Sequence, residues 1–308
     1  MIYTLTLNPS VDYFVQLEEV KIGELNRSKS EMKFPGGKGI NVSRVLKRMG
    51  VTTRALGFIG GFTGKYIEDF LQNEKIETDF VRIKEDTRIN IKLKTKTETE
   101  INAKGPHISE RDFQGLKEKI NHLTDGDLLI LAGSIPAAMP KTTYEELVKI
   151  CFKNGTRFVV DAEGDLLKKV LPYKPFLIKP NHHELGEFFD TEITSREEAI
   201  KYGKQLLDMG AQNVIVSLAA KGAVFINEAC ALIAEVPKGE VISSVAAGDS
   251  MVAGFLAKYE ETKDVKEAFR YSVAAGSATA FSIGLCTSDK VEKLLPHVSI
   301  KQIGIELE

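Results

Sequence analysis

The chain has 308 residues, of which 43% are hydrophobic and 27% charged, and its formal net charge at pH 7 is -2. This balance is typical of a soluble globular protein with one large or two modest α/β domains, and it excludes the basic surface that binds nucleic acid or an anionic membrane. No apolar run approaches the roughly 20 residues that span a bilayer. Because the segment from Met1 to Leu7 also lacks the basic start of a signal peptide, we expect a cytoplasmic protein.

Two short strands and a glycine-rich turn are predicted in the first 50 residues. Residues 2–7 and 11–17 have the composition of strands, and Asp12 lies near the start of the second. The turn Gly36-Gly37-Lys38-Gly39-Ile40-Asn41 is followed by apolar residues at helical spacing, which are Val42, Val45, Leu46 and Met49. Glycines let the backbone approach a ligand and Lys38 adds a positive charge, although a plain loop-to-helix junction has the same appearance.

A hairpin with alternating polarity is predicted over residues 88–102. Apolar Ile89, Ile91 and Leu93 alternate with polar Asn90, Lys92 and Lys94, which indicates a strand with one solvated face. Together with residues 11–17 and 29–34, this hairpin suggests a small antiparallel sheet separate from the main body. We therefore expect one domain over residues 1–308, with a β lid built from about residues 11–35 and 87–103.

Strands and helices alternate from Ser109 onward. Strands are predicted at 128–132, 157–161, 176–178 and 214–218, and capping-box pairs at Thr142/Glu145 and Ser195/Glu198 mark the starts of two intervening helices. Such alternation predicts a largely parallel sheet covered by helices on both faces, with ligands at the carboxyl ends of its strands. The polar residues expected at that edge are Asn8, Ser134, Asp161, Lys179, Asn181 and Ser217.

The stretch Ala246-Ala247-Gly248-Asp249 precedes another helical pattern, carried by Val252, Phe255, Leu256 and Tyr259. Small residues at a helix N-terminus allow an anion to approach free backbone N–H groups, and the helix dipole favours negative charge there. An aspartate in this position would repel the anion unless it takes a proton from a hydroxyl that attacks a phosphoryl group. The alternative is that Asp249 is only a first-turn acid that complements the dipole.

In their order and spacing, three motifs together resemble the ribokinase-like carbohydrate kinases of the phosphofructokinase-B family. They are Gly36-Gly37-Lys38-Gly39-Ile40-Asn41, Lys179-Pro180-Asn181-His182-His183-Glu184 and Ala246-Ala247-Gly248-Asp249. The resemblance extends from Thr6 to Ser277. It is strongest to the bacterial 1-phosphofructokinases, with the tagatose-6-phosphate kinases close behind, and the finer match lies in Thr87–Asn90, Glu100–Asn102 and Lys174–Asn181.

This resemblance implies a three-layer α/β/α fold with a mainly parallel central sheet and a small β-sheet lid. It also implies ATP-dependent phosphorylation of D-fructose 1-phosphate to fructose 1,6-bisphosphate. Asp249 would be the catalytic base, and the backbone N–H groups of Ala246, Ala247 and Gly248 would form the anion hole for the transferring phosphoryl group.

The same resemblance implies roles for further residues. Asp12, Gly37 and Asn41 would bind sugar hydroxyls, and the phosphate already on the substrate would meet Lys38, Arg88 and Arg27. Ser134 would also bind the substrate. The nucleotide would be bound by Lys179, Asn181, Ser217, Gly222 and Gly248, with residues 273–277 near the adenine. Asn181 and Glu184 would act on Mg²⁺, mainly indirectly, and the need for a monovalent cation stays open.

One departure from the family pattern bears on activity. The usual Gly-Ala-Gly-Asp is Ala246-Ala247-Gly248-Asp249 here, and alanine would be strained at the first position if that position needs a positive φ. Two rival hypotheses remain. The first is a tagatose-6-phosphate kinase, which the resemblance also allows. The second and more remote is a sugar-phosphate-binding regulator, whose catalysis the replacement of the glycine would have weakened. The edge of the small sheet also suggests a homodimer formed through the lids.

Overall fold

The computed structural model describes residues 1–162 and 164–304. Its strands are β1 (Ile2–Thr6), β2 (Ser10–Gln16), β3 (Ser30–Gly36), β4 (Thr53–Ile59), β5 (Glu77–Thr78), β6 (Val81–Arg82), β7 (Arg88–Lys94), β8 (Glu98–Ile101), β9 (Leu128–Ala132), β10 (Arg157–Asp161), β11 (Leu177–Ile178), β12 (Asn213–Ser217), β13 (Ala223–Asn227), β14 (Ala231–Glu235) and β15 (Ser299–Ile303). Its α-helices are α1 (Lys38–Arg48), α2 (Gly61–Asn73), α3 (Glu110–Asn121), α4 (Thr143–Asn154), α5 (Gly164–Val170), α6 (His182–Phe189), α7 (Arg196–Asp208), α8 (Ala247–Thr262), α9 (Val265–Ala280) and α10 (Ser288–Leu294). None of the helices in these two ranges is long and apolar enough to cross a membrane.

The central sheet has the strand order β15-β14-β13-β12-β11-β10-β9-β1-β4-β5, and β6 also pairs with β4. The pairs from β12 to β5 are parallel, whereas β13, β14 and β15 continue the sheet in antiparallel fashion. The predicted mainly parallel sheet is therefore confirmed. The parallel strands bring their carboxyl ends to one edge, where the polar residues predicted from the sequence gather.

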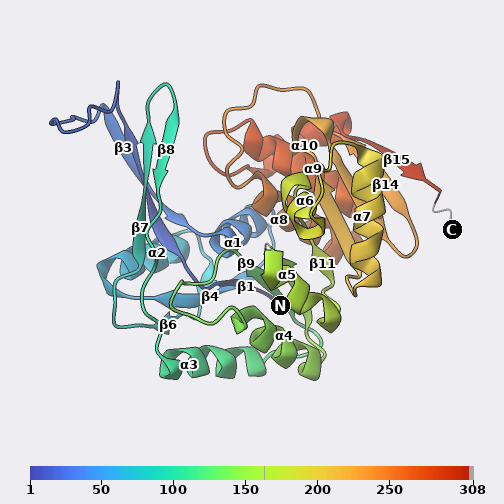
Figure 1. Cartoon of the computed structure of the whole chain (residues 1–308), viewed down its shortest axis with the longest axis horizontal. Helices are drawn as coiled ribbons and strands as arrows, with labels where there is room; N and C mark the ends of the chain where they lie inside the picture. Colours follow the sequence, from blue (N-terminus) through green and yellow to red (C-terminus); the bar gives the residue numbers. More distant parts are fainter. Residues whose placement is uncertain (163, 305–308) are drawn as a thin grey trace.

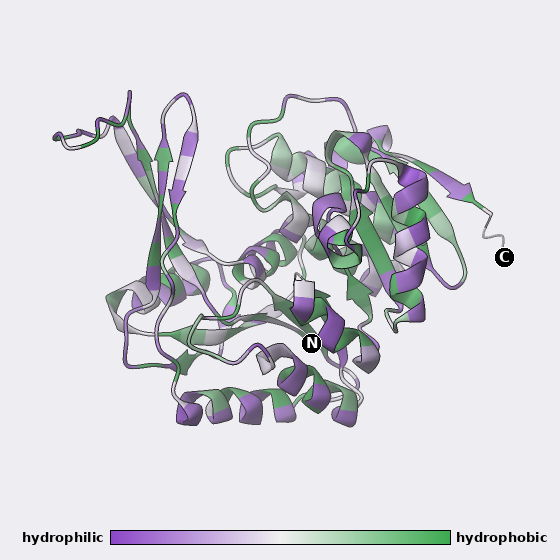
Figure 2. Ribbon diagram, viewed as in Figure 1, coloured by the Kyte–Doolittle hydropathy of each residue, from purple (hydrophilic) through white to green (hydrophobic). Residues whose placement is uncertain are grey.

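Helices cover both faces of this sheet (Figure 1). Strand β9 shows the division, because Leu129 and Leu131 pack with α3 to α7, whereas Leu128 and Ile130 pack with α1, α8, α9 and α10. Helix α2 packs on the latter face through Ile67 and Leu71. The strands are buried on both sides and the outer helix faces are hydrophilic (Figure 2), which gives the expected α/β/α layers.

The helix caps agree with the sequence at one predicted site and differ at the other. Ser195 and Glu198 form the capping box expected at the start of α7. The Thr142/Glu145 prediction is wrong, because Thr142 has a helical backbone conformation and its hydroxyl donates to Glu146. With its backbone already helical, Thr142 does not place its side chain over the N–H groups of the first turn.

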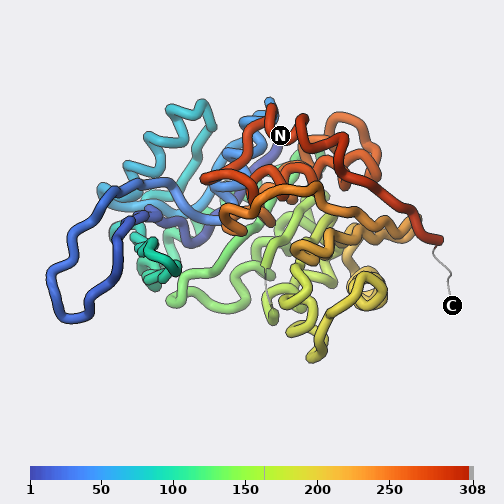
Figure 3. Tube along the Cα trace, turned by 90° about the horizontal axis from the view of Figure 1, so that it is seen from above, coloured from blue at the N-terminus to red at the C-terminus, as the bar shows by residue number. Residues whose placement is uncertain are grey.

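A small sheet with the order β3-β2-β7-β8 stands apart from the central sheet. Pairs β2–β3 and β7–β8 are antiparallel, whereas β2 and β7 are parallel, so the sheet is mixed and not antiparallel throughout as expected. The connection between β2 and β3 reaches out beyond the body of the molecule (Figure 3).

The alternation predicted for β7 is present, but its faces are reversed. Asn90 and Lys92 are only 6% and 7% exposed, whereas Ile89 is 41% exposed. Lys92 forms an ion pair with Glu100, and Asn90 lines a cavity beneath the sheet. The prediction of a solvated polar face is therefore wrong for these two residues, because the polar side of the small sheet faces inward.

Candidate active site

Two cavities lie at the carboxyl edge of the central sheet. The first, of about 860 Å³, lies between the small sheet and the ends of β1, β9 and β10. The second, of about 550 Å³, is bounded by the ends of β11 and β12 and by α6, α8 and α9. Lys38 lines both, and the start of α8 separates them, with Ala246 and Asp249 in the first cavity and Ala247 and Gly248 in the second. The two cavities therefore meet at Lys38 and the start of α8.

The first cavity brings together most of the residues predicted for substrate. Its lining includes Asp12, Gly37, Lys38, Asn41, Arg88 and Ser134. Gly37 is the N-cap of α1 and has a φ of 121°, a conformation that strongly favours glycine. Arg27 is the exception, because it is exposed in the connection between β2 and β3 and does not line either cavity.

The second cavity brings together the residues predicted for the nucleotide. Its lining includes Lys179, Asn181, Glu184, Ser217, Gly222 and Gly248, and on α9 it includes Val273, Gly276 and Ser277. Gly222 has a φ of 97°, and a Cβ there would lie 2.0 Å from the carbonyl oxygen of Ala234. A glycine is therefore required at this turn.

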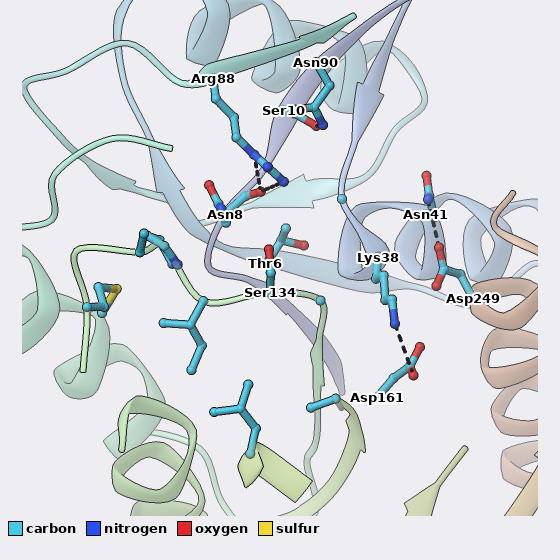
Figure 4. Close-up of a pocket in the computed structure, with 18 of the residues that line it drawn as sticks. Thr6, Asn8, Ser10, Lys38, Asn41, Arg88, Asn90, Ser134, Asp161 and Asp249 are labelled. Carbon is cyan, nitrogen blue, oxygen red and sulfur yellow. Dashed lines mark hydrogen bonds and ion pairs between the residues drawn. The ribbon is translucent and has the colours of Figure 1, made fainter. Parts of the chain in front are cut away.

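Asp249 is buried in the first turn of α8. Its side chain accepts a hydrogen bond from Asn41 Nδ2 at 2.8 Å (Figure 4). Burial, with the neighbouring Asp161 carboxylate as the second cause, raises the pKa of Asp249 to about 6, against the opposing effects of Asn41, Lys38 and Lys179. A carboxylate with this pKa is ionised at neutral pH and accepts a proton more readily than an ordinary aspartate.

The start of α8 presents backbone donors beside this carboxylate. The Ala247 N–H donates to the Ser244 carbonyl at 3.3 Å and the Ser250 N–H to the Ala246 carbonyl at 3.0 Å. The Gly248 and Asp249 N–H groups lie between them, in the turn where an α-helix has no internal acceptors. A Cβ at position 248 would lie 2.8 Å from Lys179 Nζ, so the glycine allows the ammonium group to reach the helix start.

A buried carboxylate, Asp161, holds the two lysines of the site together. Its Oδ1 lies 3.6 Å from Lys38 Nζ and 3.8 Å from Lys179 Nζ. Its Oδ2 is buried and has no hydrogen-bond partner among the described residues. Sequence reasoning placed Asp161 at the carboxyl edge but not among the site residues, and only the three-dimensional arrangement reveals this ion cluster.

The Asn181/Glu184 motif forms a capping box at the start of α6. Asn181 Oδ1 accepts from the Glu184 N–H at 2.9 Å, and Glu184 Oε2 accepts from the Asn181 N–H at 2.7 Å. Burial raises the pKa of Glu184 above its ordinary value. The pair predicted for Mg²⁺ thus caps a helix in this structure. The other carboxylate oxygen of Glu184, Oε1, is not part of this capping box.

Arg88 joins the small sheet to the main body. Its Nε and Nη2 donate to the Asn8 carbonyl at 3.2 and 3.0 Å (Figure 4). Its Nη1 donates to the Ala103 carbonyl at 2.9 Å. Partial burial lowers the pKa of its guanidinium group, and Asp12 acts in the opposite direction. Within the part of the chain that the structure describes, these bonds use three of its five N–H groups, which leaves two for a ligand in the first cavity.

Where the family pattern has a glycine, Ala246 adopts a backbone conformation with a positive φ, which is strained for alanine. Ala246 has φ 60° and ψ 8°, in the left-handed region. We expect Ala246→Gly to raise the free energy of unfolding by about 0.5–1 kcal/mol, because glycine relieves the strain at some entropic cost. Urea unfolding would measure this, with Ala253→Gly inside the same helix as a control that should lose about 1 kcal/mol. A less stable Ala246→Gly variant would contradict this reading.

Several polar residues of the first cavity were not among the predicted site residues, and Ser10, Asn90 and Lys141 are three of them. Asn90 had a usable signal, because it lies two residues from Arg88 on a predicted strand and therefore shares its face. Ser10 and Lys141 lie in a strand start and a loop, where no periodicity marks the side chains that face a cavity.

Comparison with known proteins identifies the family. The chain is 54% identical over 303 residues to a 1-phosphofructokinase of Bacillus subtilis, covering 98% of this chain and 100% of the relative. It is 42% identical to a D-tagatose-1-phosphate kinase of Bacillus licheniformis, covering 98% and 100%. The structure of phosphofructokinase-2 from Escherichia coli in complex with substrates and products matches with a TM-score of 0.91 and 30% identity, over 96% and 98% of the two chains. A family model described as pfkB family carbohydrate kinase matches residues 5–292, and the chain belongs to this family.

Proposed function

We propose that this kinase transfers the γ-phosphoryl group of ATP to D-fructose 1-phosphate and forms fructose 1,6-bisphosphate. The observation that carries the proposal is the meeting of two cavities at Asp249 and Lys38, one suited to a sugar phosphate and one to a nucleotide. The 54% identity to a 1-phosphofructokinase supports the choice of sugar.

In the proposed reaction, Asp249 takes the proton of the sugar hydroxyl at the end opposite the phosphate. The hydroxyl oxygen attacks the γ-phosphorus, the bond from that phosphorus to the β,γ-bridging oxygen breaks, and ADP leaves. The Gly248 and Asp249 N–H groups at the start of α8 face the charge that develops on the transferring group. This differs from the set of amides expected from the sequence, because the Ala247 N–H already has an acceptor.

The phosphate already on the sugar would bind at the far side of the first cavity. Arg88 and Ser134 are the proposed ligands, since Arg88 retains two N–H groups there. Lys38 is better suited to the transferring group, because its ammonium lies beside Asp161 and borders both cavities. Arg27 lies outside the cavity and has no part in the proposed single-chain site. Asp12, Gly37 and Asn41 remain the proposed partners of the sugar hydroxyls.

The second cavity would hold ATP and its Mg²⁺. The candidate ligands of the ion lie on the two sides of the junction between the cavities. They are the buried Oδ2 of Asp161 in the first cavity, which has no hydrogen-bond partner among the described residues, and the Glu184 oxygen outside the capping box in the second, both of the kind that Mg²⁺ prefers. The described residues contain no group of three or more acidic, histidine or cysteine residues able to hold a metal, which fits an ion bound mainly by phosphates and water. When bound, Mg²⁺ neutralises charge on the phosphates of ATP. The requirement for a monovalent cation stays a prediction.

A second candidate substrate is D-tagatose 1-phosphate, since a relative 42% identical is named for it. This sugar keeps its phosphate at the same end as fructose 1-phosphate and differs in the configuration of one hydroxyl. Tagatose 6-phosphate, the alternative suggested by the sequence, carries its phosphate at the other end.

A coupled assay of ADP release tests these candidates. It would compare fructose 1-phosphate, tagatose 1-phosphate, tagatose 6-phosphate, fructose 6-phosphate and fructose. The highest kcat/KM should belong to fructose 1-phosphate. A preference for either tagatose phosphate would move the substrate and leave the mechanism, whereas binding without turnover of any of them would favour the regulator.

We further propose that the small sheet acts as a lid and that two copies associate through it. Exposed apolar side chains lie on both faces of this sheet and in the β2–β3 connection. Ile89 and Ile101 are on the face opposite Asp12, Met32 and Phe34 are on the face that carries Asp12, and Ile22 and Leu25 are in the connection. Ile101→Glu should therefore weaken association at least about tenfold in sedimentation velocity. Phe152→Glu on α4 is the matched control, because Phe152 is as exposed as Ile101, at 55%. A monomeric wild-type protein, or equal association of Ile101→Glu and wild type, would contradict the lid interface.

A further inference from the structure

The carboxylate of Asp12 is held by neighbours on all three strands around it. Ser10, on the same strand, donates its hydroxyl proton to Asp12 Oδ1 at 2.7 Å. Asn90, directly opposite on β7, donates from Nδ2 to Asp12 Oδ1 and to Ser10 Oγ, both at 3.1 Å. Gly36 on β3 completes the enclosure, because a Cβ there would lie 2.4 Å from three atoms of the Asp12 carboxyl group.

Asn90 has no donor left for a ligand, although it lines the cavity. Both N–H bonds of its amide are used by Asp12 and Ser10, and its Oδ1 accepts from the Ala103 N–H at 3.2 Å. The side chain is 6% exposed and Ser10 is 1% exposed. Asn90 therefore acts on a ligand through Asp12 and not by direct donation.

The direction of these bonds sets which oxygen of Asp12 meets the ligand. Among the described residues, the hydrogen bonds to Asp12 all fall on Oδ1, which leaves Oδ2 to accept from hydroxyl groups in the cavity. The chain of donors from Asn90 through Ser10 to Asp12 is cooperative, because each bond polarises the next. The Ala103 N–H, two residues after the end of β8, donates to Oδ1 of the same amide. This bond links Asn90 to the segment that follows the small sheet.

We propose that Asn90, together with Ser10, is a positioning residue that sets the rotamer of Asp12 and so determines how tightly the sugar hydroxyls are bound. This inference rests on the proposed role of Asp12 in binding the sugar. Strand β7 must pair with β2 before Asn90 can hold the Asp12 carboxylate in the rotamer that binds the sugar. The arrangement thus links the folding of the lid strands to sugar affinity without a direct contact between Asn90 and the sugar.

The substitution Asn90→Asp tests this inference with almost no change in side-chain shape. At pH 8 the introduced carboxylate repels Asp12 and removes both donated hydrogen bonds. The KM for fructose 1-phosphate should rise at least about tenfold, the scale of a lost hydrogen bond to a charged group. The KM for ATP should stay within about twofold of wild type, because the second cavity does not include this network.

Lowering the pH should reverse the defect. Two carboxyl groups at hydrogen-bond distance share a proton, so one of them is protonated at a higher pH than an isolated carboxyl group. The protonated group again donates to Asp12, and the ratio of the variant KM to the wild-type KM should fall toward one near pH 6. A side chain with only a structural role would not show this recovery.

Other charged groups near the network are present in both wild type and Asn90→Asp, and we expect each to affect the sugar KM equally in the two proteins. They are Arg88 and Lys92 on β7, Lys38 at the start of α1 and Asp249 at the start of α8. The ratio of variant to wild type at each pH therefore isolates the introduced carboxyl group. Ser10→Ala should also raise the sugar KM, but without the recovery at low pH, because it adds no titrating group.

The matched control is Asn102→Asp. Asn102 lies beside β8, next to the same hairpin, and donates to the Glu100 carboxylate at 3.2 Å, but it is exposed and lies outside the cavity. This variant loses the same kind of bond and should keep the wild-type KM for the sugar. Circular dichroism would verify that both variants are folded.

The outcomes separate this inference from the proposed function. An unchanged sugar KM in Asn90→Asp at pH 8, or a raised KM that does not recover at low pH, would overturn the positioning role while the kinase activity stands. A wild-type protein that phosphorylates none of the five sugars would instead overturn the proposed function. An equal loss in Asn102→Asp would show a general effect of charge on the small sheet and would also overturn the positioning role.

Discussion

Asp249→Asn is expected to lower kcat for fructose 1-phosphate at least about a thousandfold. Asparagine keeps the size of the side chain and its place beside Asn41, but it cannot take the proton of the attacking hydroxyl. The KM for each substrate should change much less, because the cavity walls stay in place. Steady-state kinetics of ADP release would measure both quantities.

The same substitution is expected to stabilise the protein at high pH. Because the pKa of Asp249 in the folded state is about 6, above the ordinary value of 3.8, the folded protein binds more protons than the unfolded chain between these values. Stability therefore falls as the pH rises through that window, and the full penalty remains above about pH 6. Removing the buried charge should raise the free energy of unfolding by about 1–3 kcal/mol at pH 8, and by less at pH 5.

Urea unfolding at the two pH values checks this result. The control is Asp165→Asn, since Asp165 lines the same cavity but is exposed, and it should give no such gain. An Asp249→Asn variant that keeps more than a tenth of the wild-type kcat would contradict the role as base. A variant less stable than wild type at pH 8 would contradict the unfavourable burial of its charge.

Lys38→Met is the second substitution with a large expected effect. Lys38 lies 3.6 Å from Asp161, borders both cavities and lowers the pKa of Asp249. Methionine keeps most of the length of the side chain but removes the charge that would face the transferring phosphoryl group. We expect kcat to fall about a hundredfold or more.

The pH dependence of this variant gives an independent check. Without the Lys38 ammonium, the pKa of Asp249 should rise above its value of about 6, so the acidic limb of the pH–rate profile should move to higher pH. Lys47→Met, in the last turn of the same helix and outside both cavities, should leave kcat and the profile unchanged. A Lys38→Met variant with the wild-type profile would show that Lys38 does not act on Asp249.

The parallel half of the fold was predictable because its strands are buried on both faces. Runs such as residues 128–132 and 158–160 are continuous in apolar character and are separated by helical patterns, so both their type and their order can be read from the chain. The antiparallel strands β13 to β15 were not predicted. The pairing of β14 with β15 joins segments more than 60 residues apart, whereas β12–β13 and β13–β14 are consecutive hairpins.

Burial in the small sheet could not be predicted from alternation alone. A period of two shows that Ile89 and Asn90 face opposite sides, but not which side faces the cavity. A polar cavity reverses the usual rule, because the side chains that meet it are buried and polar. The exposed apolar side chains of the opposite face, Ile89 and Ile101, are then available for contact with a second copy of the protein.

The site itself was predictable at the level of motifs but not of interactions. The motifs around Lys38, Asn181 and Asp249 carry residues for two adjacent cavities, and the structure brings these cavities together at the start of α8. The roles of Asp161 and Asn90 arise from contacts between segments far apart in sequence. The left-handed backbone of Ala246 also depends on the path of the preceding loop, which has no periodic signal.

The most direct test of the central claim is to follow the reaction of ATP with fructose 1-phosphate by ³¹P nuclear magnetic resonance. The claim predicts that the γ-phosphate signal of ATP disappears as ADP forms, and that an equal amount of a second phosphate ester appears on the sugar. No new ester should appear with Asp249→Asn. Release of inorganic phosphate without a new ester, or equal ester formation by the variant, would contradict transfer through Asp249 at the junction of the two cavities.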